Sequence, residues 1–240
     1  MRRKGSGNSI MITINQLKTE IKFDKTGKKL ELEDMLDDKA TLTKKAAKIL
    51  NIHENDVSNI CILKHSIDAR KKPQIFQVYT LGIELKNKCL EEKIVKRCKN
   101  NNVAVYAQKQ YVFPKSGETE LPQRPVIIGM GPAGLFCGYM LARHGYKPLL
   151  LERGYDVDTR TKDVEAYWNG GCLKSESNVQ FGEGGAGTFS DGKLNTLVKD
   201  KFGRNKEVLR ILVEFGAPER ILYESKPHIG TDILKKVVVN

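Results

Sequence analysis

The strongest constraint on the fold of this chain is a glycine-rich segment near its middle, PVIIGMGPAGLFCGYMLARHGYKPLLLE, at residues 125–152. An apolar run, a GxGxxG turn, an apolar stretch with helical spacing and a second apolar run follow one another, and the segment ends in an acid. This pattern predicts a strand, a tight turn, a helix and a second strand. Because such a unit binds the pyrophosphate and ribose of a dinucleotide, the sequence points to a dinucleotide site.

The small residues of the turn each have an expected role in that site. Gly129 allows the tight turn, Gly131 lets the backbone approach a pyrophosphate, and Gly134 lets the helix pack against the strand. Amide groups near Ala133 and Gly134 supply hydrogen-bond donors and the positive end of the helix dipole. Together with Pro132, which lies between Gly131 and Ala133, these residues form the expected phosphate-binding turn.

The acid that ends the segment is Glu152, which follows Gly134 by 18 residues. Its carboxylate is expected to accept hydrogen bonds from a ribose diol and to repel a 2′-phosphate, which disfavours NADP at this site. The continuous apolar run Val126–Ile128 predicts a parallel strand covered on both faces. NAD and FAD both use such a unit, so this segment leaves the choice between them open.

A second glycine-rich segment, NVQFGEGGAGTFSDGKLNT, occupies residues 178–196. Small and hydroxylated residues separate its glycines, so its backbone N–H groups can wrap a phosphate or the edge of a flavin. Phe181 and Phe189 argue against a free linker, because such linkers seldom carry apolar anchors. We therefore expect this segment to contact the cofactor.

Together with KPHIGTDIL at residues 226–234, these two segments resemble the bacterial family of uncharacterised FAD-dependent dehydrogenases, which is distantly related to flavoproteins of the glutathione reductase type. The resemblance extends over the front half, including the SIDARKK loop. It implies FAD as the cofactor and a pyridine nucleotide as the electron donor. It further implies that Arg153 and the loop from Gly184 to Lys193 approach the FAD, through Gly184, Gly185, Ala186, Gly187, Thr188, Ser190, Asp191, Gly192 and Lys193.

The resemblance also predicts more chain than is present here, because members of that family are about twice this length. Helical patterns dominate after Glu152, and few strands remain to complete a doubly wound sheet. The expected fold is thus an incomplete FAD-binding Rossmann-type domain of the glutathione reductase type at residues 125–240. We expect that domain to be truncated, and the catalytic residues stay unknown.

The front half predicts a different architecture. Alternating residues at 11–23 indicate a strand, and Leu42, Ala46, Ala47 and Leu50 share one face of a helix that Thr41 or Thr43 would cap. Strands at 57–65 and 74–85, a helix at 87–99 and a strand at 102–108 complete the order β, α, β, β, α, β. That order is typical of a small ferredoxin-like α+β domain, here at residues 1–115, with a Pro- and Gly-containing linker at 116–124.

The charge of the chain is unevenly distributed. The net charge is +12, and residues 1–120 hold 24 Lys and Arg against 15 Asp and Glu, whereas the second half holds 17 against 14. A basic front domain is compatible with RNA, so one alternative is a flavoprotein that acts on RNA. Sparse aromatic residues among the lysines argue against nucleic acid. Another alternative is a non-catalytic interaction module with an incomplete nucleotide fold.

Several function classes find no support in the sequence. The five cysteines include no CxxC pair, and no HExxH, GxSxG or GxxxxGK[ST] motif occurs, which disfavours zinc, hydrolase and P-loop chemistry. No apolar run approaches the length of a membrane span, and the start lacks the apolar core of a signal peptide. The expected protein is a cytoplasmic flavoprotein that does not contact a membrane.

Overall fold

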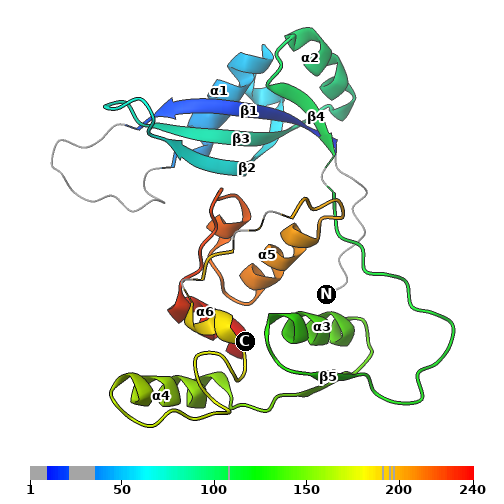
Figure 1. The fold of residues 1–240 in the computed structure, drawn as a ribbon. Helices are drawn as coiled ribbons and strands as arrows, with labels where there is room; N and C mark the ends of the chain where they lie inside the picture. The colour runs from blue at the N-terminus through cyan, green and yellow to red at the C-terminus, as the bar shows by residue number, and fades with distance from the viewer. Residues whose placement is uncertain (1–9, 22–35, 108, 191, 195, 197) are drawn as a thin grey trace. The chain divides into compact units, whose positions relative to one another are not determined.

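The computed structural model describes residues 10–21, 36–107, 109–190, 192–194, 196 and 198–240. Over these residues the protein is a mixed α/β structure with an antiparallel sheet and several helices (Figure 1). It divides into two compact units. Unit 1 contains the described residues up to Tyr111 together with Asp200–Arg204 and Leu222–Ser225, and unit 2 contains Val112–Lys199, Asn205–Ile221 and Lys226–Asn240. The linker predicted at 116–124 therefore lies within unit 2.

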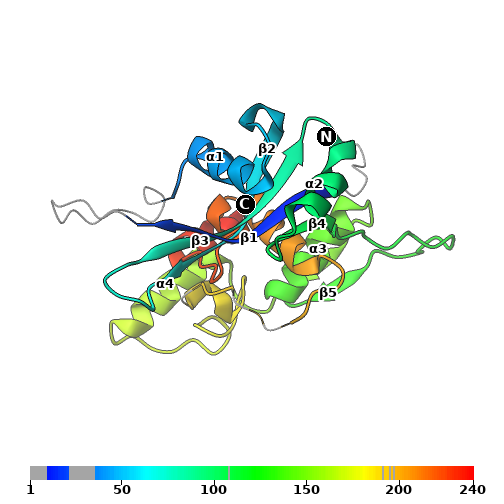
Figure 2. The same ribbon diagram turned by 90° about the horizontal axis from the view of Figure 1, so that it is seen from above.

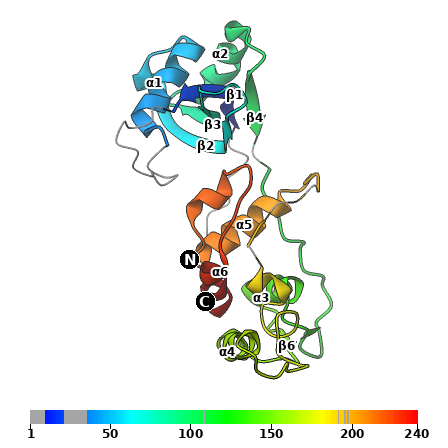
Figure 3. The same ribbon diagram turned by 60° about the vertical axis from the view of Figure 1, so that its left-hand side comes forward.

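Unit 1 is built on a four-stranded sheet with the strand order β2-β3-β1-β4, in which all neighbours are antiparallel. Helices α1 and α2 cover one face of this sheet (Figures 1 and 3), and Figure 2 looks onto that helical layer. The order of elements is the one that the sequence predicts. They are β1 (Ile10–Glu20), α1 (Lys39–Leu50), β2 (Val57–Asp68), β3 (Phe76–Leu85), α2 (Glu91–Cys98) and β4 (Val103–Ala107), with short 3-10 helices at Glu54–Asp56 and Lys88–Leu90.

The core of unit 1 lies between the sheet and its two helices. The four residues predicted to share a face of α1 are all buried, and three of them, Leu42, Ala46 and Leu50, belong to the core cluster that includes the sheet residues. At the centre of the sheet Ile83 pairs with Ile12 on β1 and with Ile60 on β2, and Ile83 is fully buried. The fully or nearly buried residues of this core are Ile12, Ile14, Leu17, Leu42, Ala46, Leu50, Ile60, Tyr79, Leu81, Ile83, Leu85, Ile94 and Val103.

Two local predictions for unit 1 were wrong. The cap of α1 is Asp38, whose Oδ1 accepts a hydrogen bond from the Thr41 N–H at 2.6 Å, and neither Thr41 nor Thr43 serves as the cap. The pKa of Asp38 lies below its ordinary value because its carboxylate accepts a hydrogen bond from the Thr41 N–H, which has no partner within the helix. Strand β2 continues to Asp68, so the polar connection to β3 is shorter than expected. The predicted strand ends at 22–23 and 108 lie outside the described residues.

Unit 2 contains the predicted strand, turn, helix and strand. Strand β5 (Val126–Ile128) and strand β6 (Leu149–Leu151) form a parallel pair, and α3 (Pro132–Arg143) connects them. Figure 3 shows α3 beside β6. The remaining elements are α4 (Val157–Trp168), α5 (Arg204–Glu214), α6 (Thr231–Val239) and 3-10 helices at Ala186–Phe189 and Glu219–Leu222. A small second core gathers Ala217, Ile221, Ile229 and Val237.

The expectation that β5 is covered on both faces was wrong. Val126 is 56% exposed and Ile128 is 86% exposed, whereas Ile127 and Leu150 turn toward α3. A helix packs on one side of the two-stranded sheet, and the described residues leave the other side open. The apolar run therefore identifies a strand correctly, but its second cover is not supplied by the described part of this chain.

Three further features of the described residues concern membrane-spanning helices, disulfides and clusters of metal ligands. None of the helices in the described ranges is long and apolar enough to cross a bilayer. All five cysteines are free thiols. Within the same ranges no group of three His, Cys, Asp or Glu side chains is placed to hold a metal ion.

Candidate functional site

The turn between β5 and α3 is shaped by the backbone conformations of its glycines and by Pro132. Gly129 has a φ of +95°, in the region that favours glycine, and its N–H donates to the Leu151 carbonyl at 2.7 Å. Gly131 is the N-cap of α3, and Pro132 occupies the first helical position, where its missing N–H costs nothing. The backbone of the protein itself thus holds the turn against the end of β6.

Two glycines of the turn differ in what surrounds them. A Cβ on Gly134 would lie 1.9 Å from the Gly129 carbonyl oxygen, so the close approach of α3 to the turn requires glycine there. A Cβ on Gly131 would meet nothing within 4 Å, and its φ of −70° is open to any residue. Glycine at 134 therefore serves the fold, whereas the space at 131 is available to a ligand.

Glu152, at the end of β6, holds the turn through its carboxylate. Its Oε2 accepts from the Met130 N–H at 2.6 Å, and its Oε1 accepts from the Gly154 N–H at 2.9 Å. Partial burial alone raises the pKa of Glu152, but the backbone donors of Met130, Gly154 and Arg153 outweigh it, so the pKa lies below the ordinary 4.5. The side chain is a carboxylate at neutral pH.

The Met130, Gly154 and Arg153 amides do not exhaust the carboxylate of Glu152. Its two oxygens have four lone pairs between them, so the group can still accept a further hydrogen bond. A ribose diol supplies two hydroxyl donors, and the 2′-phosphate of NADP would add negative charge beside the carboxylate. The geometry of Glu152 is therefore compatible with the ribose role predicted for it.

The second glycine-rich segment lies directly against the turn. The Gly184 N–H donates to the Met130 carbonyl at 2.8 Å. A Cβ on Gly185 would lie 3.2 Å from both the Gly131 Cα and the Pro132 Cδ, and Gly185 has a φ of +64°. The structure thus brings together two predicted segments that are about 50 residues apart in sequence.

Sequence reasoning missed two residues that organise this region. Arg160 of α4 is fully buried, and its guanidinium donates to backbone carbonyls of the second segment. The Glu183 carboxylate accepts from the Val157 N–H at 2.8 Å and so ties the same segment to the start of α4. A signal was available, because Arg160 shares one face of α4 with Val157 and Val164, which are both buried.

The other predicted residues have varied surroundings. Thr188 is fully buried, and its hydroxyl has no hydrogen-bond partner among the described residues. The Ser190 hydroxyl donates to the Gly187 carbonyl at 2.9 Å. The exposed Arg153 side chain pairs with Glu176 and lies over the Phe181 ring. Asp191 lies outside the described residues.

The end of the second segment pairs with the KPHIGTD segment. Lys193 forms an antiparallel bridge with His228, and the Ile229 N–H donates to the Gly192 carbonyl at 3.1 Å. Gly192 has a φ of +68°, and a Cβ there would lie 2.8 Å from the Gly230 nitrogen. His228 itself is exposed. The backbone of His228 therefore lies beside the second segment, while its imidazole is exposed to solvent.

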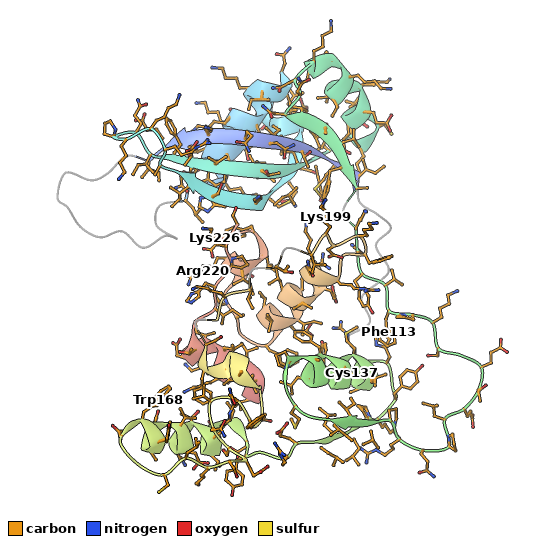
Figure 4. All side chains as sticks on the ribbon, in the orientation of Figure 1. Phe113, Cys137, Trp168, Lys199, Arg220 and Lys226 are labelled. Atoms are coloured by element: carbon orange, nitrogen blue, oxygen red, sulfur yellow. The ribbon has the colours of Figure 1, made fainter. Side chains whose placement is uncertain are left out.

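A cavity of about 710 Å³ borders these elements within unit 2. Its lining is mainly apolar and comes from α3, the second glycine-rich segment, α5 and α6; it includes Phe136, Tyr139, Gly184, Lys193, Leu212 and Leu234. Cavities of this size and character are typical of small-molecule sites. Trp168, labelled in Figure 4, does not line it; that residue is 64% exposed and meets the Phe189 ring edge-on.

Comparison with known proteins adds two findings. Residues 11–84, within unit 1, match a family model described as a domain of unknown function, DUF8436. The chain is 48% identical over 204 residues to an uncharacterized protein of Clostridium beijerinckii. The match covers 85% of this chain but 37% of the relative, so the chain spans well under half of that protein's length.

Proposed function

We propose that unit 2 binds FAD and that this chain belongs to a flavoprotein oxidoreductase. The observation that carries the proposal is the meeting of the glycine turn, Glu152 and the second glycine-rich segment around the open position of Gly131. The resemblance of these segments to FAD-dependent dehydrogenases favours FAD over NAD. Bound FAD would supply two-electron chemistry, while the protein supplies binding and orientation.

The residues present suit FAD in three respects. The first amides of α3, near Ala133 and Gly134, offer donors and a positive dipole end to the pyrophosphate. Glu152 is an ionised acceptor for the adenosine ribose. The unpaired hydroxyl of the buried Thr188 belongs to the same segment, and such groups call for a partner that the described residues do not supply.

The apolar cavity beside the second segment is our candidate for the flavin ring. Gly184, Gly187, Ser190 and Lys193 line it, and each was predicted to approach the cofactor. A mainly apolar lining with a few polar groups suits a flavin, whose ring has a hydrophobic edge and a polar edge. A pyridine nucleotide as electron donor is part of the same proposal, on the basis of the resemblance.

The decisive experiment uses Gly131→Ala. Because a Cβ at this position meets no protein atom, the thermal midpoint should stay unchanged, while a methyl group in the path of the pyrophosphate should weaken FAD binding at least about tenfold. Flavin fluorescence titration measures the affinity, and thermal unfolding followed by Trp168 fluorescence measures the stability of unit 2.

Gly117→Ala is the matched control, since a Cβ there also meets nothing within 4 Å and Gly117 belongs to the predicted linker rather than to the turn. Its FAD affinity should equal that of the unaltered chain. FAD binding that is equally strong in Gly131→Ala, or that is absent from the unaltered chain, would contradict the proposal.

A further inference from the structure

The most unusual charged group of the molecule is the guanidinium of Arg160. This side chain is fully buried, and arginine is rarely buried unless it is paired. Among the described residues it forms no ion pair at contact distance; Glu152 acts on it only through its charge, and Phe189 offers a ring face 4.8 Å away. Burial lowers the pKa of Arg160 below its ordinary value, but an arginine keeps its charge at neutral pH.

Backbone carbonyls replace the missing carboxylate. The Nε atom donates to the Asn178 carbonyl at 2.7 Å, and Nη2 donates to Val179 at 2.9 Å. The Nη1 atom donates to Glu183 at 2.7 Å, to Gly185 at 2.9 Å and more weakly to Gly182 at 3.4 Å. One side chain therefore holds five carbonyls of the second glycine-rich segment.

This clamp extends to the turn through a single peptide group. The Glu183 carbonyl accepts from Arg160, and the N–H on the other side of the same peptide, that of Gly184, donates to the Met130 carbonyl at 2.8 Å. The Met130 N–H in turn donates to Glu152. A continuous series of hydrogen bonds thus joins α4, the second segment, the turn and the acid at the end of β6.

The clamp has two consequences for an anionic ligand. C=O and N–H point in opposite directions across a trans peptide, so the peptide whose Gly185 carbonyl binds Arg160 directs its N–H, that of Ala186, away from the guanidinium. The buried positive charge also lies behind the segment, where the low dielectric strengthens its attraction for negative charge.

We propose that Arg160 is a positioning residue of the cofactor site, which holds the second glycine-rich segment against the turn in the arrangement that receives the pyrophosphate of FAD. The inference rests on the proposed function. Arg160 does not contact the cofactor in this account; it acts through the segment whose carbonyls it binds. A glycine-rich segment has many alternative conformations, so it needs such a clamp more than other loops do.

The test compares Arg160→Ala with Lys162→Ala, which removes an exposed positive charge from the same helix. Loss of several charge-assisted hydrogen bonds should weaken FAD binding at least about tenfold in Arg160→Ala and leave it unchanged in Lys162→Ala. Low-millimolar guanidinium chloride should restore much of the affinity of Arg160→Ala. Equimolar sodium chloride should not, and guanidinium should not rescue Gly131→Ala.

Hydrogen exchange of the ligand-free protein supplies a second readout. The Glu183, Gly184 and Gly185 amides should exchange at least about tenfold faster in Arg160→Ala, while the amides of α5 and of the sheet in unit 1 keep their protection. Arg160→Lys replaces Arg160→Ala should the latter not fold. Lysine keeps the charge but cannot span five carbonyls, so we expect the same loss of protection.

The outcomes separate the two proposals. If the unaltered chain binds FAD and Arg160→Ala binds it equally well, or if guanidinium gives no rescue, the role of Arg160 is overturned and the cofactor assignment stands. If the unaltered chain binds no FAD, the cofactor assignment fails and the positioning role fails with it. Unchanged exchange at Gly184 would overturn the clamp whatever the cofactor is.

Discussion

The two units differ in how completely the strands of their sheets are buried. In unit 1 every residue of β3 is buried or half-buried; helices cover one face of the sheet, and the strand lies between β1 and β2. In unit 2 the outward residues of β5 and β6 remain exposed, including Val126, Ile128 and Leu151. Four antiparallel strands with two helices thus complete a core of their own, whereas a parallel pair with one helix does not.

This difference bears on where function can reside. Unit 1 has a core of its own between the sheet and its helices, and its sequence match is to a domain of unknown function. In unit 2, Gly184 and Gly187 of the second glycine-rich segment line a mainly apolar cavity, and the buried Thr188 hydroxyl has no hydrogen-bond partner among the described residues. The unit with the less complete packing is therefore the one that shows the features of a binding site.

The comparison can be tested most strongly at the centre of unit 1. Ile83→Ala removes a fully buried side chain between β1 and β2, so it should lower the free energy of unfolding of unit 1 by about 3 kcal/mol. Hydrogen exchange of the sheet amides measures this loss. The fluorescence of Trp168, the one tryptophan, reports on unit 2 and should show an unchanged transition.

Ile67→Ala is the control for Ile83→Ala, since Ile67 lies on β2 of the same sheet but is 46% exposed. It should cost less than about 1 kcal/mol. Equal destabilisation of both units by Ile83→Ala would contradict their separation, because it would mean that the two cores unfold as one cooperative block.

The sequence was sufficient for the elements and much less so for their surroundings. Apolar alternation and helical spacing are local, so the order of elements in unit 1 and the strand, turn, helix and strand of unit 2 follow from it. The cap of α1 was misassigned to threonine, although Asp38 stood just before the helix. The open face of β5 could not be predicted, because the cover of a strand depends on distant segments.

In the candidate site, too, the residues of a local motif could be predicted from the sequence, and the residue that depends on distant contacts could not. The turn glycines and Glu152 form a contiguous motif, and the structure places them around one another as the motif suggests. The function of Arg160 depends on five carbonyls that lie 18 to 25 residues further along the chain. A charged residue on an amphipathic helix is normally assigned to solvent, so only its spacing from Val157 and Val164 indicated burial.

Acid and neutral pH should affect the two units in opposite directions. The pKa of Glu152 in unit 2 is lowered, so its contribution to stability is present above the ordinary 4.5 and is lost as the pH falls through the lower folded value. Burial raises the pKa of Glu91 in unit 1, so its contribution is present below 4.5 and is lost as the pH rises through the higher folded value.

Substitution to glutamine isolates these contributions. At pH 7 Glu152→Gln should destabilise unit 2 by about 1 kcal/mol, because one of the Met130 and Gly154 amides loses its carboxylate acceptor. Glu91→Gln should stabilise unit 1 by about 1 kcal/mol, since it removes the cost of a buried charge. Both effects should shrink in urea unfolding as the pH is lowered from 7 and the two carboxylates become protonated, and effects of the same sign at pH 7 would show that the two carboxylates do not differ as described.

The smallest effect is expected on the open face of β5. Ile128→Ala should change the stability of unit 2 by no more than about 0.5 kcal/mol, since Ile128 is 86% exposed and buries little apolar surface. The adjacent Ile127→Ala should cost more, because Ile127 faces α3 near Gly134. Urea unfolding followed by Trp168 fluorescence measures both variants. A large loss in Ile128→Ala would mean that this face is covered in solution, and the contrast between a closed and an open sheet would then be lost.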